Sequence, residues 1–370
     1  MHWTEADTDR SARWHSESAA PMPRHVVVAD DTMRADTAYR LACEGTALLW
    51  QGDFQQARQL LQALRRRIDR IATPPGAGIA ESFHLYRRAR GHRARVLGKL
   101  IVELSEGHTL ALRRAPDLRQ VCAETYGSSG EPMVVSFTEL LGAIGAQQWR
   151  AKGVDVPALG ARIHPHYGVF SPVRGEYVDL VARAPLPTGH GGPRAGFDLG
   201  TGTGVLAAVL ARRGIDRVVA TDINPRALVC ARDNIDRLDL ADRIEVIGPD
   251  LFPDGRADLI VCNPPWLPAR PTAAVEQGVY DPDGAMLHAF LNGLAAHLDS
   301  GGEGWLILSD LAEHLGLRTR EELTDAIASA GLRVLDRIDT RPRHTRPTDP
   351  TDPLHAARAA EITSLWRLSG

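Results

Sequence analysis

The sequence predicts an α/β protein whose second part forms a doubly wound, mainly parallel sheet, and three observations carry that prediction. Between residues 160 and 370, short apolar runs alternate with segments of helical period. A glycine-rich loop, 200–204, separates the first of these runs from its helix, and acidic residues follow successive runs. Before residue 155 the period is mainly helical, so we expect a mainly helical N-terminal domain over 31–155, for substrate recognition or as a lid.

Length and composition limit the class of protein. The chain has 370 residues, enough for two domains, and 44% hydrophobic and 24% charged residues are typical of a globular protein. A net charge of −3 argues against wholesale coating of nucleic acid but allows a local basic patch. The sequence has no apolar run of membrane-spanning length, no secretory leader pattern and only four scattered cysteines. His164 and His166 lack a third ligand at metal spacing, so we interpret them as structural or solvent-exposed. We expect a cytoplasmic protein without membrane contact or metal, and the oligomeric state stays open.

The N-terminal part is predicted to begin with a poorly ordered tail, because residues 1–30 are polar and mixed. Two helices are predicted over 37–50 and 54–71, the second capped by Asp53. A third is predicted from residue 81 toward 104, and its basic residues are Arg87, Arg88, Arg90, Arg93, Arg95 and Lys99. We favour a solvated helix face for them, with a docking surface for RNA or another acidic partner as the alternative.

Seven strands are predicted in the second part, at 196–198, 216–222, 244–247, 259–262, 305–308, 332–338 and 361–368, the last two as an antiparallel hairpin. The helix over 205–213 is stopped by Gly214. The next helix is capped by Asn224, with Pro225 at its first position. The polar segment 341–353 is interpreted as a solvated loop or as a cover over the acceptor.

The glycine loop and three acids indicate a ligand site at one edge of the sheet. The Gly-x-Gly-x-Gly spacing over 200–204 differs from that of nicotinamide enzymes, and Asp198 just before it is a poor neighbour for a pyrophosphate. Asp222 follows the second strand, where an acceptor for ribose hydroxyls belongs, and Asp250 follows the third. One such acid can be only a helix cap, but three in register with a glycine loop favour a site.

A second motif, Asn263-Pro264-Pro265-Trp266, ends the fourth strand, since two prolines cannot continue a ladder. The Asn263 side chain and the Pro264 carbonyl offer two hydrogen-bond acceptors to one NH2 group. Trp266 could stack on the planar system that carries this group. The alternative is a proline turn with Trp266 in the core.

Together these motifs resemble the class I S-adenosylmethionine-dependent methyltransferases. The resemblance implies a Rossmann-like, seven-stranded methyltransferase domain over 160–370, with S-adenosylmethionine as cofactor and S-adenosylhomocysteine as product. The implied cofactor-binding residues are Asp198, Gly200, Thr201, Gly202, Gly204, Asp222, Ile223, Asp250, Leu251 and Asn263. The implied catalytic residues are Asn263, Pro264, Pro265 and Trp266, similar to the Asn-Pro-Pro-aromatic signature of enzymes that methylate planar amines and amides.

Release-factor glutamine methyltransferases and ribosomal-RNA guanine methyltransferases look closest, which implies N-methylation of a protein glutamine or an RNA base amine. Phe170 and Arg174 are weaker candidates for substrate contacts, with a packed helix as the alternative. Two features depart from these families: Trp266 replaces a tyrosine or phenylalanine, and 171–176 replaces an Arg-Pro-x-Thr-Glu element. A small specialised metabolite is therefore an alternative acceptor. A nicotinamide-dependent oxidoreductase is the alternative of another class.

Overall fold

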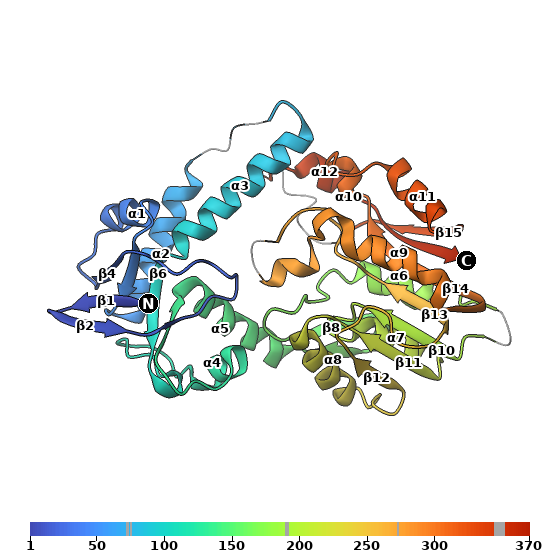
Figure 1. Ribbon diagram of the computed structural model, residues 1–370, viewed down its shortest axis with the longest axis horizontal. Coiled ribbons are helices and arrows are strands. Elements are labelled where there is room, and N and C mark those ends of the chain that lie inside the picture. Colours follow the sequence, from blue (N-terminus) through green and yellow to red (C-terminus); the bar gives the residue numbers. More distant parts are fainter. Residues whose placement is uncertain (72–73, 75, 189–191, 272–273, 344–351) are drawn as a thin grey trace. The chain divides into compact units, whose positions relative to one another are not determined.

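The computed structural model of the chain describes residues 1–71, 74, 76–188, 192–271, 274–343 and 352–370. They form two compact units (Figure 1). The first comprises Met1–Ala77 and Glu81–Gln148, and the second Gly78–Ala80 and Trp149–Gly370. The division at 148–149 lies slightly before the boundary expected between 155 and 160. Within the described ranges, no helix combines the length and the apolar character needed to cross a bilayer.

The second unit contains a seven-stranded sheet, counted over the described residues, in the order β12-β11-β10-β13-β14-β16-β15. Its strands are β10 (Ala195–Leu199), β11 (Arg217–Thr221), β12 (Ile244–Ile247), β13 (Ala257–Cys262), β14 (Leu298–Ser309), β15 (Arg333–Thr340) and β16 (Thr363–Ser369). The first five pair in parallel, whereas β16 is antiparallel to both β14 and β15. The predicted doubly wound α/β class and the terminal antiparallel pair are confirmed. The segment 341–353 falls mostly outside the described residues.

Helices cover both faces of this sheet. They are α6 (Glu176–Arg183), α7 (Val205–Arg212), α8 (Pro225–Arg237), α9 (Ala285–His297), α10 (Leu311–His314), α11 (Arg320–Ser329) and α12 (His355–Ala360). Alternate strand residues enter opposite cores: Val261 and Trp305 pack with α6, α7 and α8, while Ile260 and Leu306 pack with α9 and α11. The short elements of this unit are β8 (Val154–Val156), β9 (Ala161–Ile163), η2 (Pro157–Leu159), η4 (Ala274–Gly278) and η5 (Pro282–Gly284).

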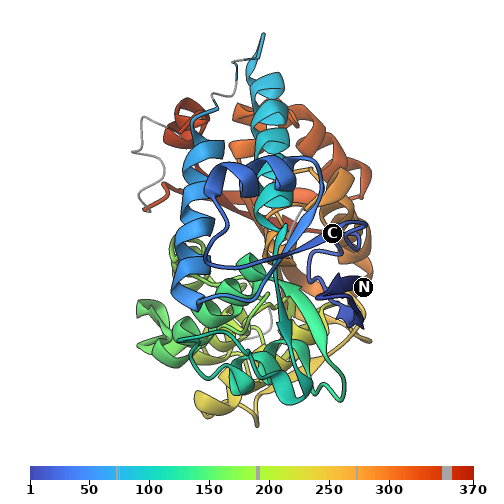
Figure 2. The ribbon, with the colours of Figure 1, turned by 90° about the vertical axis from the view of Figure 1, so that its left-hand side faces the viewer.

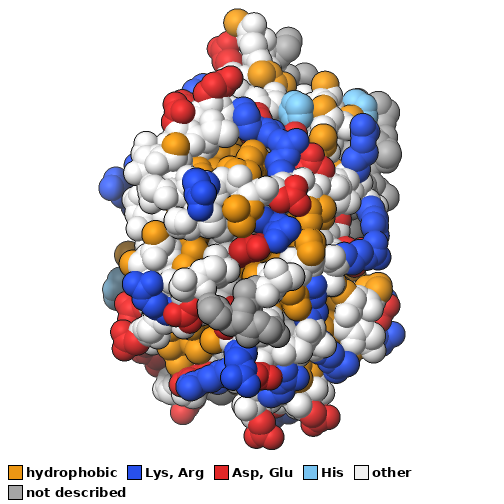
Figure 3. Space-filling view, turned by 90° about the vertical axis from the view of Figure 1, so that its right-hand side faces the viewer, with side chains coloured by type: hydrophobic (Ala, Val, Ile, Leu, Met, Phe, Trp, Pro, Cys, Tyr) orange, Lys and Arg blue, Asp and Glu red, His pale blue; other side chains and the backbone are white. Residues whose placement is uncertain are grey.

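Figure 3 shows one face of the molecule, on which basic and acidic side chains of the described residues are interspersed. The described residues on this face therefore form no broad surface of a single charge sign.

The first unit is built around a five-stranded sheet, counted over its described residues, in the order β3-β7-β6-β5-β4 (Figure 2). The strands of this unit are β1 (His2–Glu5), β2 (Thr8–Ser11), β3 (Arg13–Trp14), β4 (Val26–Ala29), β5 (Ala47–Trp50), β6 (Leu100–Leu104) and β7 (Met133–Ser136). Its helices are α1 (Ala35–Cys43), α2 (Phe54–Asp69), α3 (Ile79–Leu97), η1 (Glu106–His108), α4 (Arg119–Tyr126) and α5 (Phe137–Lys152), of which α3 and α5 each extend into the second unit.

The structure corrects the predictions for this unit in two places. Residues 1–30, expected to be a poorly ordered tail, contain four strands. Two of these pair with distant segments, for example Arg13 with Met133, and such long-range partners leave no local signal in the sequence. The helix expected over 37–50 ends at Cys43, and 47–50 forms β5, because a short apolar run fits a buried strand as well as a helix. The unit is therefore a helix-rich α/β unit and not a helical hairpin.

Candidate active site

The loop between β10 and α7 carries the three predicted glycines in conformations that favour glycine. Gly200, Gly202 and Gly204 have φ angles of +72°, +55° and +81°. A Cβ atom on Gly204 would lie 3.3 Å from backbone atoms of Ala231, so this glycine lets the loop pack against α8. A Cβ atom on Gly202 would meet nothing within 4 Å. The backbone at Gly202 is therefore open to close approach by a ligand.

Asp198 lies beneath this loop and is only 1% exposed. Its Oδ2 atom accepts hydrogen bonds from Thr201 Oγ1 at 2.6 Å and from the Ala207 N–H at 2.9 Å. Burial raises the pKa of Asp198 to about 6, and the nearby Asp222 carboxylate also raises it, against the effect of the two hydrogen bonds. Asp198 thus holds the glycine loop against the first turn of α7.

We expect Asp198 to make the free energy of unfolding fall as the pH rises from about 4 to about 6. In this range the native state holds a proton that the unfolded chain, with an ordinary pKa of 3.8, has released. The full difference is roughly 3 kcal/mol, gained below this range and lost above it. Urea unfolding of the wild type and of Asp198→Asn, whose amide oxygen can accept the same two bonds, would measure it. Equal pH slopes for the two proteins would contradict the expectation.

Asp222, at the end of β11, is fixed by backbone donors. Its Oδ2 accepts from the Gly202 N–H at 2.9 Å and its Oδ1 from the Asn224 N–H at 2.8 Å. Burial raises its pKa, and these hydrogen bonds oppose that shift. The neighbouring Ile223 is 73% exposed. A carboxylate oxygen can accept two hydrogen bonds, so each Asp222 oxygen retains capacity for a ligand beside the glycine loop.

The segment after β12 is drawn toward Asp222. Thr221 Oγ1 donates to the Leu251 carbonyl at 2.6 Å, which joins the ends of β11 and β12. Asp250 is exposed and Leu251 is half-buried. The structure therefore places Asp222, Ile223, Asp250 and Leu251 at one part of the carboxyl edge of the sheet.

The signature Asn263–Trp266 directly follows β13, with Pro264 buried and Pro265 half-buried. The Asn263 Oδ1 atom accepts a hydrogen bond from Trp266 Nε1 at 2.9 Å. Arg174 lies over the Trp266 ring, its guanidinium carbon 4.7 Å from the ring centroid. One lone pair of Asn263 and one face of Trp266 are engaged within the chain, and the second lone pair remains.

Arg174 and Phe170 are the weaker substrate candidates. Arg174 lies beside Trp266 of the signature, and Phe170 lies beside Gly278 in the segment that follows it. Arg174 donates to buried carboxylates on two sides, from Nε to Glu176 and from Nη2 to Glu361, each at 2.9 Å. Phe170 packs against Gly278, where a Cβ atom would lie 2.7 Å from the Phe170 Cβ. The structure thus supports the packed alternative for both residues while keeping Arg174 in contact with the candidate site.

Sequence reasoning missed Asp281, which organises the segment after the signature. Its carboxylate accepts from the Met286 and Leu287 N–H groups at the start of α9. Its own N–H donates to the Leu267 carbonyl at 2.9 Å. The side chain of Met286 in turn reaches Gly200, since a Cβ there would lie 2.5 Å from Met286 Cε. Asp-Pro before an apolar helical run is an N-terminal signal that could have found this residue.

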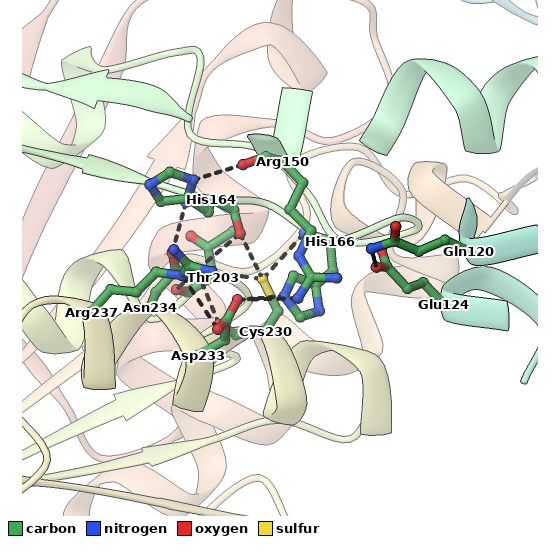
Figure 4. A network of polar contacts seen from close by, with 10 residues as sticks. All are labelled: Gln120, Glu124, Arg150, His164, His166, Thr203, Cys230, Asp233, Asn234 and Arg237. Atoms are coloured by element: carbon green, nitrogen blue, oxygen red, sulfur yellow. Dashed lines mark hydrogen bonds and ion pairs between the residues drawn. The ribbon is translucent and has the colours of Figure 1, made fainter. Parts of the chain in front are cut away.

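His164 and His166 belong to a polar network around α8 (Figure 4). The Asn234 amide accepts from the His164 N–H at 2.6 Å and donates to the Thr203 carbonyl at 3.1 Å. His166 Nε2 lies 2.9 Å from Asp233 Oδ2. These contacts tie the segment before Phe170 to the glycine loop and give both histidines structural roles. Over the described ranges, no cluster of three or more potential ligands could hold a metal ion.

The sheet order, the glycine loop after β10 and the signature after β13 define a Rossmann-like fold of the methyltransferase class. Residues 160–326 match the family model described as methyltransferase small domain. The predicted resemblance to methyltransferases is thereby confirmed, and the family match gives no support to the nicotinamide-dependent alternative.

Two relatives and one solved structure illustrate the similarity. The release factor glutamine methyltransferase of Cereibacter sphaeroides is 35% identical over 162 residues, 40% of this chain and 56% of that protein. The ribosomal protein L11 methyltransferase of Vibrio parahaemolyticus is 38% identical over 91 residues, 24% of this chain and 31% of that protein. The chain thus spans between just under a third and just over half of the length of these relatives. A methyltransferase structure from Pyrococcus furiosus aligns with 63% of this chain and 98% of its own, at 20% identity and a TM-score of 0.40.

Proposed function

We propose that the chain is an S-adenosylmethionine-dependent N-methyltransferase that acts on a planar amine or amide nitrogen. The register of two neighbouring strands carries the proposal. Leu199 of β10 pairs with Cys262 of β13 in parallel. The glycine loop, from Gly200, and the signature, from Asn263, therefore start next to each other at the same edge of the sheet. This edge lies where the strand order reverses, which is the usual place for ligands in open α/β sheets.

The residues at this edge suit the proposed cofactor. The open backbone at Gly202 allows close approach, and the Asp222 carboxylate would accept hydrogen bonds from ribose hydroxyls. Ile223, Asp250 and Leu251 would flank the adenine. When bound, S-adenosylmethionine supplies a methyl group that its sulfonium already activates.

The chain's own task is then to orient the acceptor nitrogen. The remaining lone pair of Asn263 Oδ1 and the carbonyl of Pro264 would accept the N–H bonds of the acceptor and aim its lone pair. The same two oxygens would stabilise the positive charge that develops on the nitrogen. A strong general base is not required, because the proton can leave after methyl transfer.

A protein amide is the leading methyl acceptor, because one relative is named as a release factor glutamine methyltransferase. The other relative is named for a ribosomal protein, which also favours a protein as acceptor. An RNA base amine is the second candidate. The observation that favours it is the run of basic side chains along α3, which carries Arg88 and Arg95 exposed at the surface.

We expect S-adenosylhomocysteine to bind the full chain in a calorimetric titration, and NAD not to bind. Incubation with methyl-labelled S-adenosylmethionine and separate protein and RNA fractions would then identify the acceptor class. Label that is lost on protease treatment supports the protein amide, and label lost on ribonuclease treatment supports the RNA amine. Binding of NAD without binding of S-adenosylhomocysteine would refute the proposed function.

A further inference from the structure

The Trp266 side chain is fixed from two directions, and this suggests why the signature ends in tryptophan. Its indole N–H donates to Asn263 Oδ1 at 2.9 Å, while Arg174 covers one face of the ring. Phenylalanine has no ring donor, and the hydroxyl of tyrosine lies at the far end of its ring. Of phenylalanine, tyrosine and tryptophan, only tryptophan can place a donor at the ring edge that faces Asn263 here.

This hydrogen bond also determines how the Asn263 amide is turned. An amide carries an acceptor on one side and donors on the other, and the orientation follows from its partners. Because the indole N–H can only donate, the oxygen of Asn263 must face Trp266. One lone pair of the Asn263 oxygen is used by Trp266, and the other is left for an N–H group of the methyl acceptor.

Arg174 is itself held in place by two ion pairs, so its side chain does not move freely away from the Trp266 ring. The side chains of Glu176 and Glu361 are 1% and 0% exposed, and both bind the one guanidinium of Arg174. Moving Arg174 away would leave two buried carboxylates without their cation, which is strongly unfavourable. Glu361 is itself anchored at the end of β14, since its Oε1 accepts from Ser309 Oγ at 2.7 Å. The Arg174 guanidinium therefore stays over one face of the Trp266 ring.

We propose that Arg174 and Trp266 are positioning residues that set the orientation of the Asn263 amide for methyl transfer. This inference rests on the proposed function of Asn263. The contacts run from Ser309 through Glu361 and Arg174 to Trp266, and from its indole N–H to Asn263. Because Arg174 covers one face of the Trp266 ring, a planar methyl acceptor cannot stack on that face.

The test uses the indole N–H of Trp266 as a reporter in the full chain, labelled with nitrogen-15 and assigned by its loss in Trp266→Phe. In Arg174→Lys the positive charge remains, but the planar guanidinium that binds Glu176 and Glu361 together is lost. We expect the hydrogen exchange of this indole proton to accelerate at least about tenfold, because its hydrogen bond opens more often. Arg337→Lys is the matched control, since Arg337 lies 5.2 Å from the ring of a different tryptophan, Trp366. It should leave the Trp266 signal unchanged.

Turnover gives the second readout, with labelled S-adenosylmethionine and the fraction that the wild type methylates. Trp266→Phe and Arg174→Lys should each lower kcat by roughly 10- to 100-fold, while the KM for the acceptor and the affinity for S-adenosylhomocysteine stay within about twofold. A merely structural role would shift that affinity and the unfolding midpoint together with kcat. Unchanged exchange in Arg174→Lys, or unchanged kcat in Trp266→Phe, would overturn the inference. A wild type that binds no S-adenosylhomocysteine would instead refute the proposed function, and the exchange experiment would still report on the contacts.

Discussion

Replacing Asn263 by alanine is expected to abolish methyl transfer while cofactor binding persists. The side-chain oxygen of Asn263 is the proposed acceptor for the substrate N–H, next to the glycine loop through the pairing of β10 with β13. Without it the nitrogen is no longer aimed and its developing charge loses a partner, which together should cost about a thousandfold or more in kcat. The main cofactor contacts proposed above lie on other residues, so the affinity for S-adenosylhomocysteine should change by less than about threefold.

Two measurements check this expectation: label transfer under single-turnover conditions, and calorimetry with S-adenosylhomocysteine. Asn292→Ala is the matched control, since Asn292 is an exposed asparagine on α9 of the same unit. It should behave as the wild type in both. Near-normal turnover of Asn263→Ala would show that Asn263 is not the acceptor-binding group.

The sequence predicted the edge of the sheet that carries the candidate site because the signals there are local. Two prolines had to end β13, whose last residue is Cys262. Asn224 with Pro225 had to begin α8, and the Asn224 side chain does accept from the Arg226 N–H. β12 forms at the residues predicted for it, 244–247. Each of these features depends on residues within a few positions of one another, so composition and spacing were sufficient.

The supports of the site could not be predicted, because their partners are far apart in the chain. Glu361 binds Arg174 across 187 positions, and neither residue lies in a pattern that points to the other. The turn of the Trp266 ring toward Asn263 is likewise decided by packing against two cores and by Arg174. A sequence motif gives the residues of the site, whereas the tertiary contacts decide which of their faces and lone pairs are available to a ligand.

Replacing Asp222 by alanine is expected to weaken cofactor binding about 10- to 100-fold, the second-largest effect we anticipate. A hydrogen bond to a charged group contributes about 1.5–3 kcal/mol, and about 1.4 kcal/mol corresponds to a tenfold change in affinity. The same substitution frees the Gly202 N–H, which Asp222 holds at 2.9 Å, so the glycine loop also loses an anchor. Both effects act on cofactor affinity.

Calorimetry with S-adenosylhomocysteine measures this loss, and Asp222→Asn separates its two causes. Asparagine keeps one acceptor oxygen, so it can still hold the Gly202 N–H but loses the charge that strengthens a ribose contact. Its affinity should fall between those of the wild type and Asp222→Ala. Asp236→Ala, at an exposed acid on α8, is the control and should bind as the wild type does. If Asp222→Ala bound S-adenosylhomocysteine as tightly as the control, the carboxylate would serve only to hold the Gly202 and Asn224 N–H groups, and the ribose assignment would fail.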